Sequence, residues 1–145
     1  MLRLLAALLL FGTAASAQKK VIESALAPAP IGPYSQAIEV NGTVYVSGQI
    51  GLIPGVGRLT PGGVDAEVPR IMENIRAILK EAGLDYQDIV STTIYVKNMA
   101  DFPKINKLYE IYFVNQFPAR STVGVADLPA GANVEIAVMA VRRKF

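Results

Sequence analysis

The feature that most constrains the fold is an apolar run near the C-terminus, Val134-Glu135-Ile136-Ala137-Val138-Met139-Ala140-Val141. Its β-branched residues favour a strand, and successive side chains of a strand point to opposite faces of a sheet. Both faces of this strand are apolar apart from the carboxylate of Glu135. The sheet must therefore be covered on both faces where this strand lies.

Two helices are predicted from the spacing of apolar residues. They recur at helical spacing from Val64 to Glu81, and Gly83 supplies a stop signal after this helix. A second helix is predicted from Phe102 to Phe113, with Asp101 as its cap and Pro103 in its first turn. These are the elements available to cover one face of the sheet.

Strands are predicted where β-prone runs are bounded by turn residues. Asn41-Gly42 is a preferred pair for a two-residue hairpin turn, and the glycine- and proline-rich segment from Gly48 to Gly63 is typical of a surface loop. The last two strands are expected to pair antiparallel across a short turn. The predicted strands are Ala37–Val40, Thr43–Ser47, Ile89–Val96, Ser121–Val125 and Val134–Val141, with a short one near Val21-Ile22.

The order (β)ββαβαββ predicts an α+β domain with a mixed sheet and two helices on one of its faces. Two helices cover only one face, and an apolar second face left in water would form a large adhesive patch. We therefore expect another copy of the chain to cover the second face, and hence an oligomer.

The N-terminal segment has the three-part layout of a secretory signal. Arg3 gives a basic start, Leu4 to Phe11 is an almost unbroken apolar run, and Ala15-Ser16-Ala17 supplies small residues for cleavage. A membrane-spanning helix needs about 20 apolar residues, more than this run contains. We expect residues 1–17 to be a signal peptide cleaved near Ala17, which leaves a domain of residues 18–145 with no membrane attachment in the periplasm or outside the cell. The rival interpretation is an uncleaved anchor.

The composition excludes several classes of site. The chain has no cysteine and no histidine, which excludes disulfides, thiol nucleophiles, the usual zinc sites and Ser-His-Asp triads. The net charge is +2, and residues 1–17 hold one Arg and no acid, so cleavage lowers it to +1. A chain so close to neutral lacks the electrostatic footprint of a nucleic-acid-binding protein.

Arg120 and Glu135 are the candidate catalytic residues. An arginine can bind a carboxylate in a bidentate manner, and a Glu inside an apolar run has a raised pKa that makes it a better proton acceptor. The pair favours a small anionic substrate held by Arg120 and a water activated by Glu135. Each residue also has a structural interpretation: Arg120 could be a solvated cation at a strand end, and Glu135 could be a charge at the edge of the sheet or the partner of a basic side chain. Antiparallel pairing would separate the two along the ladder, so a cleft between subunits is an alternative way to bring them together.

Six ordered motifs are similar to those of the Rid (YjgF-type, reactive intermediate deaminase) family. The resemblance covers essentially all of residues 21–143, in order and with compatible spacing. The motifs are Ile31-Gly32-Pro33-Tyr34-Ser35-Gln36-Ala37, Val46-Ser47-Gly48-Gln49-Ile50, Asn74-Ile75-Arg76-Ala77-Ile78-Leu79, Glu81-Ala82-Gly83-Leu84, Phe117-Pro118-Ala119-Arg120-Ser121 and Val134-Glu135-Ile136.

The resemblance implies a homotrimer of chorismate-mutase-like domains with the sheets facing inward and sites between subunits. It implies hydrolysis of enamine and imine intermediates such as 2-aminoacrylate to a 2-keto acid and ammonia, without cofactor or metal. Arg120 would hold the substrate carboxylate and Glu135 would activate water. Tyr34, Ser47 and Asn106 would line the pocket, with backbone groups around Gly48 placing the substrate.

Three features depart from the family pattern. Thr122 stands where well-studied relatives often have cysteine, so this pocket position offers only a hydroxyl for hydrogen bonding. The segment Val114-Asn115-Gln116 is shorter than in some relatives, and a signal peptide is unexpected for imines made in the cytoplasm. A small-carboxylate-binding protein without catalysis, and a chaperone-like interaction protein, remain alternative hypotheses on the same scaffold.

Overall fold

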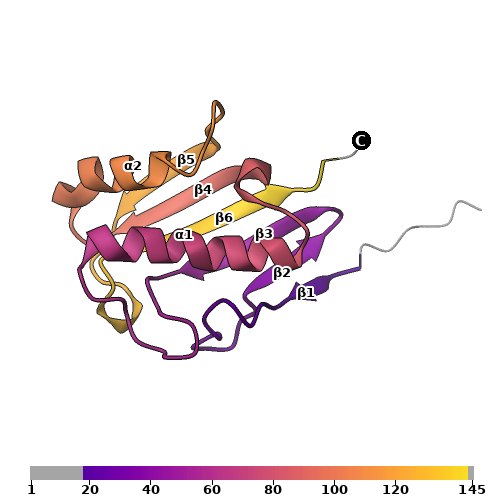
Figure 1. The fold of residues 1–145 in the computed structure, drawn as a ribbon, viewed down its shortest axis with the longest axis horizontal. Helices are drawn as coiled ribbons and strands as arrows, with labels where there is room; N and C mark the ends of the chain where they lie inside the picture. Colours follow the sequence, from indigo (N-terminus) through magenta and orange to yellow (C-terminus); the bar gives the residue numbers. More distant parts are fainter. Residues whose placement is uncertain (1–17, 144–145) are drawn as a thin grey trace, which may run out of the picture.

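Six strands form one mixed sheet, and two helices lie across the same face of it (Figure 1). The computed structural model describes residues 18–143, so the predicted signal peptide lies outside the described residues. The strands are ordered β1-β2-β3-β6-β4-β5. The elements are β1 (Lys20–Ile22), β2 (Ala37–Val40), β3 (Thr43–Gln49), α1 (Val64–Glu81), β4 (Ile89–Val96), α2 (Phe102–Glu110), β5 (Ala119–Gly124) and β6 (Val134–Val141), with 3-10 turns η1 (Tyr86–Asp88), η2 (Met99–Asp101) and η3 (Pro129–Gly131).

The predicted α+β class, the element order and the bounds of α1, β2, β4 and β6 are confirmed. Helix α2 ends at Glu110 and not at Phe113, because the chain tightens there: the Tyr112 and Phe113 N–H groups donate to carbonyls three residues back, those of Tyr109 and Glu110. Asp101 is the N-cap residue of α2, as predicted, although its side chain does not cap the helix. Asp101 closes η2 and makes no capping hydrogen bond, whereas Asn98 caps that turn by accepting from the Ala100 N–H.

The predicted pairing of the last two strands is also wrong. Strand β5 pairs with β4 in parallel, and β4 lies between β5 and β6. Helix α2 carries the chain back along β4 before β5 begins, so β5 must run in the direction of β4. The chain then crosses through η3, and β6 enters the sheet between β3 and β4.

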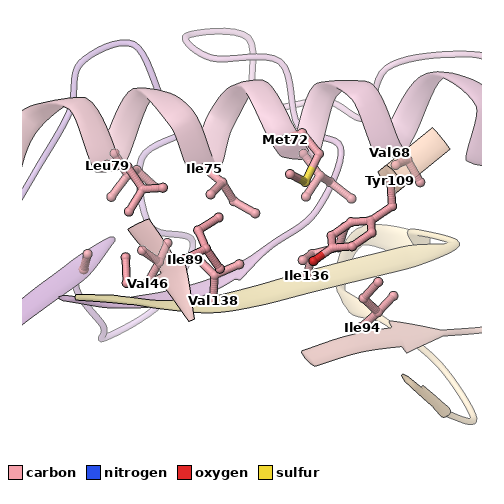
Figure 2. Packing of buried hydrophobic residues seen from close by; sticks show 14 of the residues in the cluster. Val46, Val68, Met72, Ile75, Leu79, Ile89, Ile94, Tyr109, Ile136 and Val138 are labelled. Carbon is pink, nitrogen blue, oxygen red and sulfur yellow. The ribbon is translucent and has the colours of Figure 1, made fainter. Parts of the chain in front are cut away.

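The hydrophobic core fills the space between α1 and the sheet (Figure 2). Val68, Met72, Ile75 and Leu79 recur along one face of α1 at helical spacing and are fully buried. They pack towards strand residues that include Ile136, which is also fully buried. Burial of each such side chain contributes about 1.5–3 kcal/mol. This core holds β6 firmly in the middle of the sheet.

The other face of the sheet carries apolar side chains that the single chain leaves in solvent. Along β6, Met139 and Val141 are 37% and 38% exposed, and Tyr45 on β3 and Val123 on β5 are 48% and 44% exposed. The register pairs Tyr45 with Met139, which places these two together on this face. The apolar second face predicted from the sequence is therefore present. Within residues 18–143, no helix has the length and apolar character needed to cross a bilayer.

Candidate functional site

Glu135 lies near the start of β6, on the face of the sheet opposite the helices. Its neighbours Val134 and Ile136 are fully buried under the helices, so the strand alternation directs Glu135 the other way. Strand β3 bulges beside it, because the register moves from Val46 to Gln49 across the ladder with β6. Bulges commonly redirect side chains at functional sites. Here the bulge places the backbone of Gly48 directly against the Glu135 side chain.

A cavity of about 250 Å³ opens next to this carboxylate, and we call it the Glu135 cavity. The Ser47 hydroxyl donates to the Ser35 carbonyl at 2.7 Å, and the Tyr34 hydroxyl accepts from the Ile31 N–H at 3.2 Å. The structure thus places three predicted site residues, Tyr34, Ser47 and Gly48, beside Glu135. The lining residues are Ile31, Tyr34, Ser47, Gly48, Ile50, Pro129 and Glu135.

The apolar walls of the Glu135 cavity alter the acid–base behaviour of the carboxyl. Burial raises the pKa of Glu135 above its ordinary value of 4.5, as expected from the apolar run in the sequence. A carboxylate with a raised pKa is a stronger base once it is ionised. Glu135 is therefore suited to accepting a proton from water.

Arg120 lies on β5, on the helix-covered side of the sheet. Its guanidinium carbon is 5.4 Å from the ring centroid of Tyr109 and 5.9 Å from that of Phe102, both on α2. The Tyr109 hydroxyl donates to Thr92 at 2.9 Å, and Thr92 is the register partner of Arg120 on β4. Two aromatic faces thus hold the guanidinium by cation–π contacts. Arg120 takes part in none of the ion pairs found within residues 18–143, which leaves its charge available for an anion.

A second cavity of about 450 Å³, the Arg120 cavity, contains this guanidinium. Asn106, a predicted site residue, lines it, and the Asn106 amide oxygen is buried without a hydrogen-bond partner in the described part of the chain. Thr122 lies two positions further along β5 and lines neither cavity. Its hydroxyl oxygen is likewise buried and unpartnered among residues 18–143. The lining residues are Asn106, Tyr109, Glu110, Phe117, Pro118 and Arg120.

The two candidate catalytic residues do not meet within one chain. Arg120 pairs with Thr92 and Glu135 pairs with Tyr95, both on β4. Thr92 is buried under the helices, whereas the odd-numbered Tyr95 points to the opposite face. Arg120 and Glu135 therefore line two separate cavities on opposite faces of the sheet, which we call the two candidate half-sites. Residues 18–143 contain no cluster of acidic side chains that would hold a metal ion.

Sequence reasoning missed several residues of both half-sites. The Phe102 and Tyr109 rings that hold Arg120 are seven positions apart on α2, a helical spacing that places them on one face and was a usable signal. Phe117 and Pro118 stood inside a recognised motif but received no role. Ile50 and Pro129 reach the Glu135 cavity from loops and carry no local signal of their own.

Gly48 is required by the position of the Glu135 carboxylate. A Cβ atom there would collide with Glu135 Oε1 and lie 2.7 Å from its Cδ. We expect Gly48→Ala to lower the free energy of unfolding by about 1–3 kcal/mol, the usual cost of overpacking. Denaturant unfolding checks this. In a Glu135→Ala background the same substitution should cost much less, and an equal cost in both backgrounds would contradict the contact.

Comparison with known proteins identifies the family. The Endoribonuclease L-PSP family model matches residues 24–142. A mouse protein named 2-iminobutanoate/2-iminopropanoate deaminase is 47% identical over 88% of this chain and 94% of its own length. A Rid family protein from Yersinia pestis has a TM-score of 0.83 at 45% identity, covering 86% of this chain and 100% of its own. Escherichia coli TdcF, solved with bound serine, has a TM-score of 0.81 at 38% identity, covering 86% and 99%.

The family match extends from β2 to the end of β6, and solved relatives superpose on most of the chain with the same fold. The resemblance drawn from the ordered motifs is therefore confirmed. The chain belongs to the Endoribonuclease L-PSP family, which includes the Rid (YjgF-type) proteins.

Proposed function

We propose that the chain hydrolyses the C=N bond of small 2-imino acids, yielding 2-keto acids and ammonia. The observation that carries the proposal is the pair of half-sites, one with an unpaired guanidinium held by two aromatic rings and one with a carboxylate of raised pKa. These are the groups needed to hold a substrate carboxylate and to activate water. Relatives that are 44–47% identical are named 2-iminobutanoate/2-iminopropanoate deaminase, which supports this substrate class.

We also propose that the working unit is a homotrimer whose sheets face inward. The exposed side chains of Tyr45, Val123, Met139 and Val141 make the open face of the sheet a suitable surface for burial between copies. In this assembly the Arg120 cavity of one subunit lies against the Glu135 cavity of the next. The site is then complete only at the boundary between two subunits.

The reaction proceeds by addition of water to the imine. Arg120 binds the substrate carboxylate through its fork of N–H donors. Glu135 takes a proton from water while the water oxygen forms a bond to the imine carbon and the C=N electron pair moves to nitrogen. Glu135 then returns that proton to the nitrogen, which gives a tetrahedral adduct with one hydroxyl and one amino group. Glu135 next carries the hydroxyl proton to the amino group, and collapse of the adduct forms the C=O bond and breaks the C–N bond, releasing ammonia. Every proton moves between water, Glu135 and substrate, so these steps need no other reactant.

We propose that the other predicted residues complete this joint cleft in the assembly, including Thr122, which lines neither cavity in the single chain. Tyr34 and Ser47 lie with Gly48 on the Glu135 side. Asn106 and Thr122 lie on the Arg120 side, and each has a buried oxygen that still lacks a hydrogen-bond partner within residues 18–143. Buried polar atoms normally find a partner, so we propose that substrate or the adjoining subunit supplies it.

We further propose that the protein is exported, on the basis of the three-part segment at residues 1–17. The mature chain recovered from the exported fraction should begin at Gln18 by N-terminal sequencing. A chain that retains Met1 in that fraction would indicate an uncleaved anchor.

The experiment that tests the proposed activity is a substrate panel on the mature chain. An amino-acid oxidase generates small, branched or aromatic imino acids in situ, and release of 2-keto acid is followed with and without the protein. We expect the protein to release 2-keto acid faster than buffer alone from at least one of these classes of imino acid. If the protein accelerated the release of 2-keto acid from no imino acid in the panel, the proposed enzymatic activity would be refuted. If 2-keto acids still bound, the non-catalytic carboxylate-binding protein would remain.

A further inference from the structure

One buried acidic side chain has no part in the mechanism above. Glu67, in the first turn of α1, is only 2% exposed, and it is the one charged side chain among residues 18–143 that is buried. None of the ion pairs in that range involves it. A buried charge is costly unless hydrogen bonds or dipoles compensate it. Its place near a helix N-terminus supplies part of that compensation.

The hydrogen bonds of the Glu67 side chain all go to the segment that leads into Glu135. One carboxylate oxygen, Oε2, accepts from the backbone N–H of Asn133 at 2.9 Å and from that of Val134 at 3.4 Å. The other, Oε1, accepts from the Asn133 side-chain amide at 2.6 Å. The two residues immediately before Glu135 are therefore held by a single carboxylate. From the other direction, the Lys97 N–H donates to the Asn133 carbonyl at 3.0 Å.

The same helix face also holds the second wall of the Glu135 cavity. Asn74 lies seven positions after Glu67, so both side chains point in nearly the same direction. Its side-chain amide donates to the carbonyl of Leu52 at 3.0 Å and to that of Ile50 at 3.4 Å. Between these two, Gly51 packs so closely that an added Cβ would lie 2.8 Å from Glu67 Cγ and 3.0 Å from its Cα. Ile50 lines the Glu135 cavity.

We propose that Glu67 is a positioning residue that sets the place of the Glu135 carboxylate by anchoring the start of β6. Removal of this acceptor leaves two backbone N–H groups and one side-chain amide without partners, and the first residues of the strand then shift to regain them. Glu135 directly follows Val134, so it moves with them. A misplacement of about 1 Å in an active site can cost about 100-fold in rate. The effect on rate rests on the proposed function, whereas the effect on the position of Glu135 does not.

The test compares two substitutions of Glu67 with matched ones at Glu73, an exposed residue of the same helix whose side chain is 60% exposed. Glu67→Met keeps the length of the side chain but lacks carboxylate oxygens, and we expect kcat to fall about 10- to 100-fold. KM should change little, because Arg120 holds the substrate from another strand. Glu67→Gln keeps an acceptor oxygen and should retain most of the rate. Glu73→Met and Glu73→Gln should leave the rate unchanged.

The deciding readout is the titration of the Glu135 carboxyl, followed by NMR with carboxyl-labelled glutamate and assigned with Glu135→Gln. In the wild type its pKa should lie above the ordinary value because of burial. In folded Glu67→Met it should move towards the ordinary value as the carboxylate reaches solvent. If the wild type showed no imine hydrolysis, the proposed function would fail but this titration would still decide the role of Glu67.

Asn133→Ala provides a second test of the proposal in case Glu67→Met does not fold. It removes only the amide donor to Glu67 Oε1 and should shift the Glu135 titration in the same direction by a smaller amount. An unchanged Glu135 titration in folded Glu67→Met would overturn the proposal, whatever the rate. If Glu67→Met did not fold, an unchanged titration in Asn133→Ala would overturn it equally.

Discussion

Arg120→Lys is expected to lower kcat/KM for imine hydrolysis about 100-fold, because a hydrogen bond to a charged group contributes about 1.5–3 kcal/mol and lysine cannot reproduce the paired donors of arginine. Lysine would also lack the planar guanidinium that makes cation–π contacts with Tyr109 and Phe102. Most of the loss should appear as weaker binding of 2-keto acids, measured by calorimetry beside steady-state rates.

The matched control for this substitution is Arg58→Lys. Arg58 is an exposed arginine in the loop between β3 and α1, away from both half-sites. It should keep the wild-type rate and the wild-type affinity for 2-keto acids. If Arg120→Lys retained more than half of the wild-type kcat/KM, Arg120 would not be the carboxylate-binding residue.

Glu135→Gln is expected to lower kcat about 1,000-fold, within the usual contribution of general base catalysis, while the affinity for 2-keto acids stays the same. In the wild type only the ionised carboxylate accepts a proton. Because burial raises the pKa of Glu135, the rate should fall with decreasing pH while the pH is still above the ordinary pKa of a glutamate. The residual rate of Glu135→Gln should not fall with decreasing pH in this range. Loss of 2-keto acid binding in this variant would assign Glu135 to binding.

The same raised pKa predicts how stability depends on pH. The folded state holds the Glu135 proton more tightly than the unfolded state, so ionisation of Glu135 costs folding free energy at pH values above the folded pKa. Below the ordinary pKa of the unfolded chain's glutamate both states are protonated and the cost vanishes. Glu135→Gln should therefore be more stable than the wild type at neutral pH, and the gain should disappear as the pH falls below 4. Thermal unfolding across that range measures it, with Glu73→Gln as the control.

The elements were predictable because local patterns determine them. The periodicity of α1 placed both of its ends correctly, and the β-branched runs placed β4 and β6. The order of strands was not predictable, because it depends on which distant segments pair. A short connection between β5 and β6 favoured a hairpin, yet β4 lies between them once α2 has carried the chain back.

The candidate site was also predictable only in part. The apolar run around Glu135 was enough to predict the direction of its pKa shift, because desolvation there is a property of immediate neighbours. The grouping of Tyr34, Ser47 and Gly48 beside Glu135 came from the family resemblance and could not come from spacing. Glu67 escaped notice because an acid in the first turn of a helix is ordinarily solvent-exposed. Its hydrogen-bond partner Asn133 lies 66 positions further along the chain.

Each active site is proposed to join the Arg120 cavity of one subunit to the Glu135 cavity of another. Arg120→Ala and Glu135→Gln subunits, each inactive alone, can be coexpressed in equal amounts, with formation of mixed trimers verified by native mass spectrometry. We expect recovery of about a quarter of the wild-type rate, because random assembly joins two intact half-sites at that fraction of subunit boundaries. Mixed trimers with no recovered activity would show that Arg120 and Glu135 do not act together across a subunit boundary.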